Sequence, residues 1–346
     1  MDLWILSSDF KKLGIVDTAR SIIWANRFRE CGDFEIYVAA SAEMIELLQE
    51  ERLVMRADDN MVGIIEKIIV SSIMDEGDFL IVSGRCLRSI FDRRIIWDQT
   101  VLSGNLETAM RQLITDAFIS PAIEERKYTA LTLAAAHGYT ETVSTQYTGT
   151  ALLEAIVELC AAYDYGFTIT LGDNCLVVDF IKGVDRSTNQ SAVPHVIFSP
   201  EQGNLLKTTY TRDKTLYKSV ALVAGEGEGT ARRSTTVQRS VDLTGLARRE
   251  MFVDARDISS NEGEIADAEY LQMLAERGSQ DLATAAFVES MGGNIDAEKL
   301  YIYKKDYNLG DRVTVINKYG VQATTQVLEI VETWDETGYT MTPTFG

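Results

Sequence analysis

The sequence is poor in the residues that most often carry chemistry in proteins. Its 346 residues include only two histidines, four cysteines and four prolines. The cysteines are widely scattered and form no Cys-x-x-Cys pair, so the ligand spacings of common zinc sites are absent. A secreted disulfide framework would be denser. We therefore expect four buried free thiols, at Cys31, Cys86, Cys160 and Cys175.

Long apolar runs are also missing. No stretch approaches the roughly 18 apolar residues of a membrane-spanning helix. The first residues, MDLWILSSDFKKLG, carry an acid at position 2 and lack a basic n-region, so we predict no secretion signal. With 46% hydrophobic and 25% charged residues, the chain is predicted to be globular. Its length favours two to four packed domains.

Positive charge is in deficit. The chain has 33 basic and 52 acidic residues, a formal net charge of −19. Such a surface repels nucleic acid and anionic membranes, so we expect no specific nucleic-acid binding and no membrane insertion. Solubility is the plain interpretation of the charge. A sharper one is that an acidic wall suits a channel through which DNA passes without sticking.

Neither histidine lies in a recognised catalytic motif. His137 occurs in LAAAHGYTE, a loop-like setting, and His195 follows Pro194 at the start of a predicted strand. A Ser-His-Asp or Cys-His site needs one of them beside a nucleophile. No Gly-x-Ser-x-Gly motif occurs either. We expect both histidines to be satisfied structural side chains.

The glycine-rich segment GEGEGTARRS, residues 225–234, superficially resembles a phosphate loop. It lacks the Lys-Ser/Thr of a P-loop, and its two glutamates would repel phosphate. We predict a flexible hairpin loop. The neighbouring Arg232 and Arg233 could pair with a partner's acids, but we expect them to be solvated.

An acidic run follows that segment, and its members are Asp254, Asp257, Glu262, Glu264, Asp267 and Glu269. Calcium sites use such oxygens, but the order of an EF-hand is absent. Helix capping and a solvated helix face explain the run better. A glycosidase needs two carboxylates flanking a cleft, and no pair among the 52 acids stands out. We assign no catalytic, cofactor-binding or metal-binding residue and predict a protein that is not an enzyme.

The first 98 residues predict mostly strands. WANRFRECGDFEIYV indicates two half-buried strands joined by a turn at residues 31–33. Ser41 is a predicted N-cap for a short helix over residues 41–50. A long hairpin over residues 63–85, with its turn at 75–78, follows.

The period changes in the middle of the chain. NLETAMRQLITDAF predicts a helix that Pro121 stops, with one apolar face formed by Leu106, Met110, Leu113, Ile114, Ala117 and Phe118. A second helix is predicted within residues 149–166, with Thr150 as its N-cap and Gly166 just past its end. FTITLGDNCLVVDFIKG then predicts a hairpin that bends at residues 172–174. Together these elements predict a small α+β insertion.

From Pro194 the pattern returns to strands, in HVIFS, NLLKTTYTRD, YKSVALVAG and TTVQRSVDL. A helix is predicted over residues 263–279, with Gly278 at its C-cap. DYNLGDRVTVINKYG then predicts the start of a terminal hairpin. Gly310 would ease its turn and Asp311 would accept backbone N–H bonds there. Val313 and Val315 would face one side of the strand.

Several segments occur in the same order in a known family. They are WANRFRECGDFEIYV, GRCLRSIFDRRII, VIFSPEQGNLLKTTYTRD, VAGEGEGTARRS and YNLGDRVTVINKYG with VETWDETGYTMTPTFG. Over nearly the whole chain they resemble the ReqiPepy-type family of siphophage tail proteins. The helical insertion resembles the family more weakly. No single motif decides the likeness, which rests on the ordered set.

The resemblance implies a strand-rich α+β tail hub. It is similar in architecture to the hub cylinder of contractile-tail baseplates and to the N-terminal structural module of tail-associated lysins. Residues 1–98, completed by about 191–224, would form a first tube barrel, and residues 235–346 a second barrel with a helical insertion. Residues 99–190 would be a peripheral α+β insertion. Residues 225–234 would be a flexible loop.

The resemblance also implies partners and a location. Three subunits would form a ring that adapts the sixfold tail tube to a threefold tip. Expected neighbours are a distal tail or tail tube ring, the C-terminus of a tape-measure protein, and tail fibres or spikes. The protein would be made in the host cytoplasm and lie at the distal end of the virion tail, with no cofactor. The chain stops after its expected second barrel, so wall cutting or receptor binding is expected to belong to other proteins. The alternatives are a receptor-binding or carbohydrate-binding distal tail protein and a cell-wall hydrolase.

Overall fold

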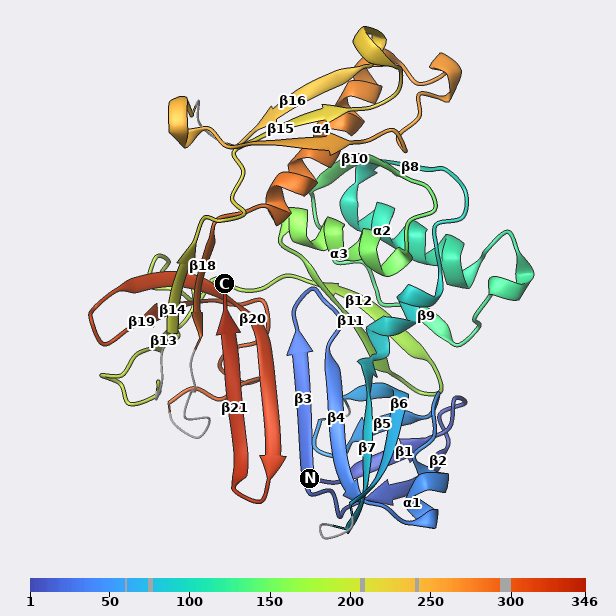
Figure 1. Cartoon of the computed structure of the whole chain (residues 1–346), viewed down its shortest axis with the longest axis vertical. Helices are drawn as coiled ribbons and strands as arrows, with labels where there is room; N and C mark the ends of the chain where they lie inside the picture. Colours follow the sequence, from blue (N-terminus) through green and yellow to red (C-terminus); the bar gives the residue numbers. More distant parts are fainter. Residues whose placement is uncertain (60, 74–76, 206–208, 240–242, 293–299) are drawn as a thin grey trace.

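The computed structural model describes the chain except for residues 60, 74–76, 206–208, 240–242 and 293–299. It is a strand-rich α+β protein, as predicted. Four groups of elements can be followed in Figure 1, and we name them the N-terminal unit, the helical insertion, the outer unit and the C-terminal unit. Within the described residues, every helix is too short or too polar to span a lipid bilayer.

The N-terminal unit is a sheet with one short helix. Its elements are β1 (Leu3–Leu6), β2 (Lys12–Val16), β3 (Ser21–Arg27), β4 (Asp33–Ala39), α1 (Ala42–Leu47), β5 (Leu53–Arg56), β6 (Val62–Ile73) and β7 (Gly77–Cys86). The predicted cap is confirmed, because Ser41 Oγ accepts the Met44 N–H at 3.1 Å. The long hairpin is also confirmed as β6–β7. Part of its predicted turn, residues 75–76, lies outside the described residues.

The helical insertion follows a 3-10 turn, η1 (Leu87–Arg93). Its elements are β8 (Thr100–Asn105), α2 (Leu106–Ile114), the π-helical turn η2 (Thr115–Ile119), η3 (Glu124–Arg126), β9 (Leu131–Leu133), β10 (Thr142–Tyr147), α3 (Leu152–Tyr163), β11 (Gly166–Leu171) and β12 (Leu176–Ile181). The predicted apolar face of α2 is buried. It packs in one core with α3 and with β-strand residues of the N-terminal unit such as Leu53 and Ile64.

The predicted cap of α3 is wrong. Ala151, not Thr150, precedes the helix, and it makes no side-chain cap bond. The backbone here is used for pairing instead, because Ile96 N–H donates to Thr150 O at 2.8 Å and Gly149 N–H donates to Ile96 O at 2.8 Å. A long-range backbone bridge therefore takes the place of a local cap. The helix ends at Asp164, which is left-handed with φ +60°, and Gly166 begins β11.

The outer unit is a three-stranded sheet covered by one helix. Its elements are β15 (Val220–Ala224), η4 (Gly229–Ala231), β16 (Ser234–Gln238), η5 (Gly245–Ala247), β17 (Glu250–Asp254), η6 (Asn261–Gly263) and α4 (Asp267–Thr284). The predicted C-cap at Gly278 is wrong, because α4 continues six residues further. A Cβ at Gly278 would lie 2.6 Å from Val223 Cγ2 and 2.9 Å from Val237 Cγ2. The glycine therefore lets the helix approach the sheet closely rather than ending it.

The C-terminal unit carries the hairpin predicted from the last part of the sequence. Its elements are β13 (Ile197–Phe198), β14 (Thr209–Asp213), β18 (Val288–Gly292), β19 (Arg312–Ile316), β20 (Gln322–Asp335) and β21 (Gly338–Phe345). The terminal hairpin is confirmed, with Ile316 opposite Gln322. Val313 and Val315 are fully buried in the core of this unit.

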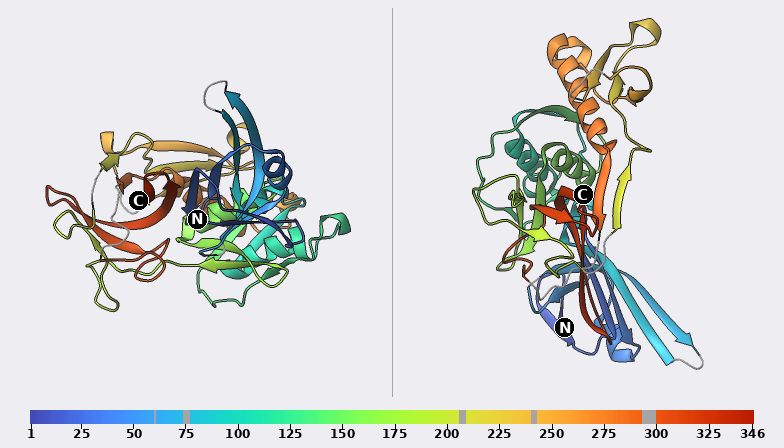
Figure 2. Two further views of the ribbon diagram at one scale, coloured as in Figure 1. Left: turned by 90° about the horizontal axis from the view of Figure 1, so that it is seen from below. Right: turned by 90° about the vertical axis from the view of Figure 1, so that its left-hand side faces the viewer.

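The two strand units share one sheet. Among the described residues its path runs β14-β18-β21-β20-β3-β4-β7-β6-β5-β1-β2, with β19 and β13 branching from β20. The seam is β3 against β20, antiparallel from Arg27 opposite Glu329 to Ile22 opposite Trp334. In Figure 1 the blue β3 and the red β20 and β21 run side by side, and the outer unit stands at the far end of the molecule. Figure 2 shows the β6–β7 hairpin projecting from the body. The two closed barrels and their boundaries stay predictions.

Candidate functional site

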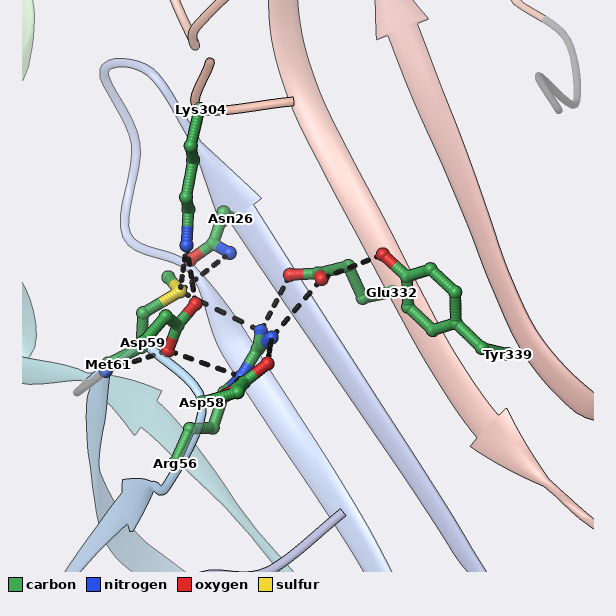
Figure 3. Close-up of polar contacts among 8 residues, drawn as sticks. All are labelled: Asn26, Arg56, Asp58, Asp59, Met61, Lys304, Glu332 and Tyr339. Atoms are coloured by element: carbon green, nitrogen blue, oxygen red, sulfur yellow. Dashed lines mark hydrogen bonds and ion pairs between the residues drawn. The ribbon is translucent and has the colours of Figure 1, made fainter. Parts of the chain in front are cut away.

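A buried polar cluster joins the N-terminal and C-terminal units beside the seam. Arg56, at the end of β5, has only 1% of its side chain exposed. Its Nη1 donates to Glu332 Oε2 at 2.6 Å and its Nη2 to Glu332 Oε1 at 3.2 Å. Glu332 lies on β20, so the planar guanidinium grips a carboxylate of the other unit with both of its ends (Figure 3).

The rest of this cluster adds two carboxylates, a lysine and a tyrosine hydroxyl. Arg56 also donates to Asp58 at 3.0 and 2.7 Å, and Tyr339 Oη donates to Glu332 at 3.0 Å. Lys304 of the C-terminal unit pairs with Asp59 of the N-terminal unit. Burial would raise the pKa of Asp58, but the hydrogen bond and charge of Arg56 outweigh it and hold that pKa below its usual value. We name this cluster the charged seam. It joins the N-terminal and C-terminal units beside the pairing of β3 with β20.

A second junction brings three units together around one aromatic ring. Phe28 follows β3 and is 1% exposed. A Cβ at Gly166, in the insertion, would lie 2.4 Å from the Phe28 ring, and one at Gly310, in the C-terminal unit, would lie 2.3 Å from it. Gly310 also has φ +88°, which disfavours a side chain. The Phe28 ring fits because the two residues that lie against it, Gly166 and Gly310, have no Cβ atom.

Charged side chains surround the Phe28 junction. Arg29 donates to Asp164, the residue that ends α3, and to Gln326 on β20 at 2.7 Å. Arg312 of β19 donates to Asp164 at 2.8 Å. Burial opposes the charged form of Asp164, yet the Gln326 hydrogen bond and the two arginines lower its pKa. Arg27 reaches Glu329 at 2.7 Å across the seam.

The Leu-Gly-Asp turn before β19 connects the insertion to the hairpin. The prediction for Asp311 is confirmed, because it accepts the Asn308 N–H at 2.9 Å and, from the insertion's exit, the Val184 N–H at 2.8 Å. Arg186 adds an ion pair at 2.8 Å. Asp311 is 2% exposed, so these donors replace its lost hydration.

The two histidines lie in separate places. His137 Nε2 lies 2.9 Å from Asp179 Oδ1, and its ring stacks on Tyr139. Its backbone N–H donates to the buried Glu107 at 2.8 Å, which anchors the loop. His195 Nε2 lies 2.7 Å from the Gln190 carbonyl oxygen. Both contacts are those of side chains that hold loops in place.

The glycine-rich segment forms the connection of the β15–β16 hairpin, as predicted. The prediction that Arg232 and Arg233 are solvated is wrong. Arg232 donates to the Ala224 and Gly225 carbonyls and pairs with Asp254. Arg233 pairs with Asp267 at 2.9 Å, and its guanidinium lies 3.8 Å from the Tyr270 ring centroid. Both arginines clamp the loop to its own unit.

The acidic run is spread over loop and helix. Asp257 pairs with Arg277 at 2.7 Å. Asp267 and Glu269 lie in the first turn of α4, where their negative charges interact favourably with the helix dipole. Among the described residues, no group of three or more His, Cys, Asp or Glu side chains is placed to hold a metal ion.

The cysteines correct the sequence-based expectation. Only Cys160 is buried; Cys31, Cys86 and Cys175 are partly exposed. The sulfurs of Cys31 and Cys86 lie 3.3 Å apart. Sequence spacing hid this pair, because it arises when β4 pairs with β7 and brings the ends of distant strands together.

An open pocket of about 440 Å³ lies on the insertion. Trp97, 57% exposed, lines it together with Asp98, Gln112, Asp116 and Arg126. The Arg126 guanidinium lies 5.4 Å from the Trp97 ring centroid. Sequence reasoning missed this pocket, since nothing in the residues around Trp97 shows that the ring is exposed.

Comparison with known proteins places the chain. The model of one family, described as Siphovirus ReqiPepy6 Gp37-like protein, matches residues 2–346. No curated protein matches the sequence.

Three solved structures share the fold at low sequence identity. The 43 kDa tail protein of prophage MuSo2 from Shewanella oneidensis has a TM-score of 0.61 at 11% identity, over 100% of this chain and 98% of that one. A tail protein from Neisseria meningitidis has a TM-score of 0.59 at 14% identity, over 99% and 95%. Prophage tail protein gp18 from Listeria monocytogenes has a TM-score of 0.54 at 14% identity, over 99% and 94%.

Proposed function

The chain belongs to the Siphovirus ReqiPepy6 Gp37-like family of tail proteins, and from this premise we propose that it is the structural hub of a tail tip. The observation that carries the proposal is the match of its whole length to the folds of tail proteins that are covered almost end to end. The internal seam supports it, because β3 and β20 make the two strand units one continuous sheet. Such a sheet suits a wall element better than a hinged enzyme.

In this proposal three copies close a ring. Each copy contributes two strand units, so three subunits present six similar elements to a sixfold tail tube and three outer elements to the tip. The neighbours would be a distal tail or tail tube ring, the C-terminus of a tape-measure protein, and fibres or spikes. The hub itself would be non-enzymatic and would stand at the distal end of the virion tail.

The net charge of −19 has a use in such a ring. A lumen lined with carboxylates would repel the phosphate backbone and let the genome slide through. Replacing lumen acids by lysines should then slow genome ejection. Unchanged ejection kinetics would remove this part of the proposal.

The test of the hub is native mass spectrometry of the 38.5 kDa chain at several protein concentrations. A species of three chains supports the ring and justifies imaging its channel. A stable dimer or another closed even-numbered oligomer contradicts it. If the free chain is a monomer, the same measurement is repeated with the neighbouring tail proteins, where the trimer must appear.

The Trp97 pocket supports a second candidate function, binding of a host saccharide. Exposed indole faces stack on sugar rings, and the carboxylates and the amide beside Trp97 can accept and donate hydrogen bonds to hydroxyls. Adsorption of the purified protein to host cells, and its loss in Trp97→Ala, would favour this function. Equal adsorption by both proteins would count against the pocket.

A further inference from the structure

Two cysteines that are 55 positions apart in the sequence face each other where the pairing of strands β4 and β7 of the N-terminal sheet ends. Cys31 lies in the connection from β3 to β4, and Cys86 is the last residue of β7. Their sulfurs are 3.3 Å apart. The β4–β7 ladder ends beside them with Asp33 opposite Arg85, so strand pairing fixes the distance between their backbones.

The backbone around the pair is held by further bonds. Cys86 N–H donates to the Gly32 carbonyl at 2.8 Å, and Gly32 N–H donates to Cys86 Sγ at 3.2 Å. A Cβ at Gly32 would lie 2.3 Å from the Ala25 carbonyl oxygen, so only glycine permits this close turn. The sulfurs need to approach by only about 1.2 Å to reach the roughly 2.05 Å of a disulfide bond.

The two thiols are electrostatically unequal. The hydrogen bond with Cys31 lowers the pKa of Cys86, with help from the Arg88 charge and against the effect of burial. The same hydrogen bond and burial raise the pKa of Cys31. The geometry agrees, because Gly32 N–H donates to Cys86 Sγ, whereas Cys31 Sγ donates to the Gly32 and Cys86 carbonyl oxygens. Cys86 is therefore taken as the first nucleophile, and Cys31 keeps its proton until the second step. Both residues are partly exposed.

We propose that Cys31 and Cys86 form a redox site that reacts with small-molecule disulfides, such as oxidised glutathione, and closes to an intramolecular disulfide. The Cys86 thiolate attacks one sulfur of the reagent R–S–S–R, forms a mixed disulfide and expels R–S⁻. Cys31 then loses its proton to solvent, and its thiolate attacks Cys86 Sγ and expels the second R–S⁻. The protein loses two electrons, and the reagent gains them as two thiolates.

The new bond would fasten the Phe28 junction. Arg27 donates to the Cys31 carbonyl at 2.8 Å, and the nearly buried Arg88 donates to the Arg27 carbonyl at 2.6 Å. A disulfide would thus tie the loop that carries Phe28 to the start of η1, from which the chain enters the insertion. If the proposed function holds, the site stays reduced during assembly in the host cytoplasm and closes after the particle meets an oxidising medium.

The test uses the full-length reduced chain and oxidised glutathione as the probe. Free thiols are counted before and after treatment, the intact mass is measured, and peptides are mapped without reduction. We expect the thiol count to fall from four to two, a mass loss of about 2 Da, and a peptide linked through Cys31 and Cys86. Cys31→Ala should instead keep a glutathione adduct on Cys86, while the control Cys175→Ala should still close the bond.

A rate measurement separates this site from slow surface oxidation. For an ordinary thiol with a pKa of about 8.5, the thiolate fraction rises by roughly two orders of magnitude between pH 6 and pH 8.5. Because the pKa of Cys86 is lowered, its reaction rate should change clearly less over that range. Four thiols after treatment, a link that involves Cys160 or Cys175, or an ordinary pH dependence would overturn the proposal. None of these readouts depends on the ring of three subunits. The redox proposal and the proposed hub function can therefore fail separately.

Discussion

At the Arg56 cluster, the N-terminal and C-terminal units meet through buried charge, whereas at Phe28 they meet, together with the insertion, around one ring between two glycines. The stability of the charged seam depends on the presence of both ionic partners, because an unpaired buried ion lowers the free energy of unfolding. The Phe28 junction depends on shape, because no atom can be added at either glycine. One chain thus joins its units by two mechanisms that should respond differently to mutation.

The largest expected effect is at the Phe28 junction. Phe28→Ala should lower the free energy of unfolding by about 3–5 kcal/mol, because it leaves a cavity where three units meet. Gly310→Ala alone should cost about as much, since it adds both a clash and left-handed strain. Urea denaturation of the single and double variants measures both changes.

The double variant gives the sharper result. Removing the ring makes room for the new methyl group, so Phe28→Ala with Gly310→Ala should cost clearly less than the two single changes together. Simple additivity of the two free energies would show that the ring and the glycine do not compete for space.

An effect of about the same size is expected at the charged seam. Arg56→Met should cost about 3–5 kcal/mol, because Glu332 loses its bidentate partner inside the protein. Arg56→Met with Glu332→Leu should recover at least about half of that loss, since no buried ion is left unpaired on β20. Thermal and urea unfolding of the set measure this; a double variant as unstable as the worse single one would contradict the assignment.

Closing the Cys31–Cys86 disulfide should stabilise the chain by about 2–4 kcal/mol through the restricted unfolded state. Unfolding of the reduced and oxidised forms measures the gain. Because the bond lies beside Phe28, oxidation should reduce the penalty of Phe28→Ala more than that of Arg56→Met. If oxidation changed the penalties of Phe28→Ala and Arg56→Met equally, the disulfide would not specifically stabilise the Phe28 junction.

A smaller effect tests a contact within one unit. The hydrogen bonds from Lys182 and Tyr165 lower the pKa of Glu141 to about 2. Its stabilising contribution is therefore present above the unfolded pKa near 4.5 and is lost as pH falls towards 2. We expect about 1 kcal/mol after solvent screening. Glu141→Gln should flatten the pH dependence of stability between pH 5 and 2 by that amount, with unfolding followed at several pH values.

The smallest expected effect is at the exposed His137–Asp179 contact. Asp179→Asn should change the free energy of unfolding by less than about 1 kcal/mol, because the pair is solvent-exposed. The same unfolding assay measures it. A loss as large as that of Arg56→Met would mean that exposed and buried ion pairs contribute equally to the stability of this protein.

Local signals in the sequence predicted local structure well. The Ser41 cap, the apolar face of α2 and the β19–β20 hairpin all rest on residues a few positions apart, and the structure contains each of them. The Asp311 turn was also predictable, because aspartate after glycine is a common acceptor in turns.

The errors and omissions share one cause, contact across long sequence distances. Gly278 resembles a helix C-cap in the sequence. In the structure, however, Val223 and Val237 pack so closely against it that a side chain would not fit. The β3–β20 seam joins residues about 300 positions apart, with Arg27 and Glu329 paired across it. Neither periodicity nor capping rules contain such information, so the junctions emerged only from the three-dimensional structure.

The seam between β3 and β20 also sets how the molecule carries force. A force along the strands loads all the backbone hydrogen bonds between β3 and β20 at the same time, from the Arg27–Glu329 pair to the Ile22–Trp334 pair. A pull across them opens the bonds one after another, like a zipper. The protein should therefore be mechanically stiff along its strands and weak at right angles to them, and single-molecule stretching in the two directions would measure that anisotropy.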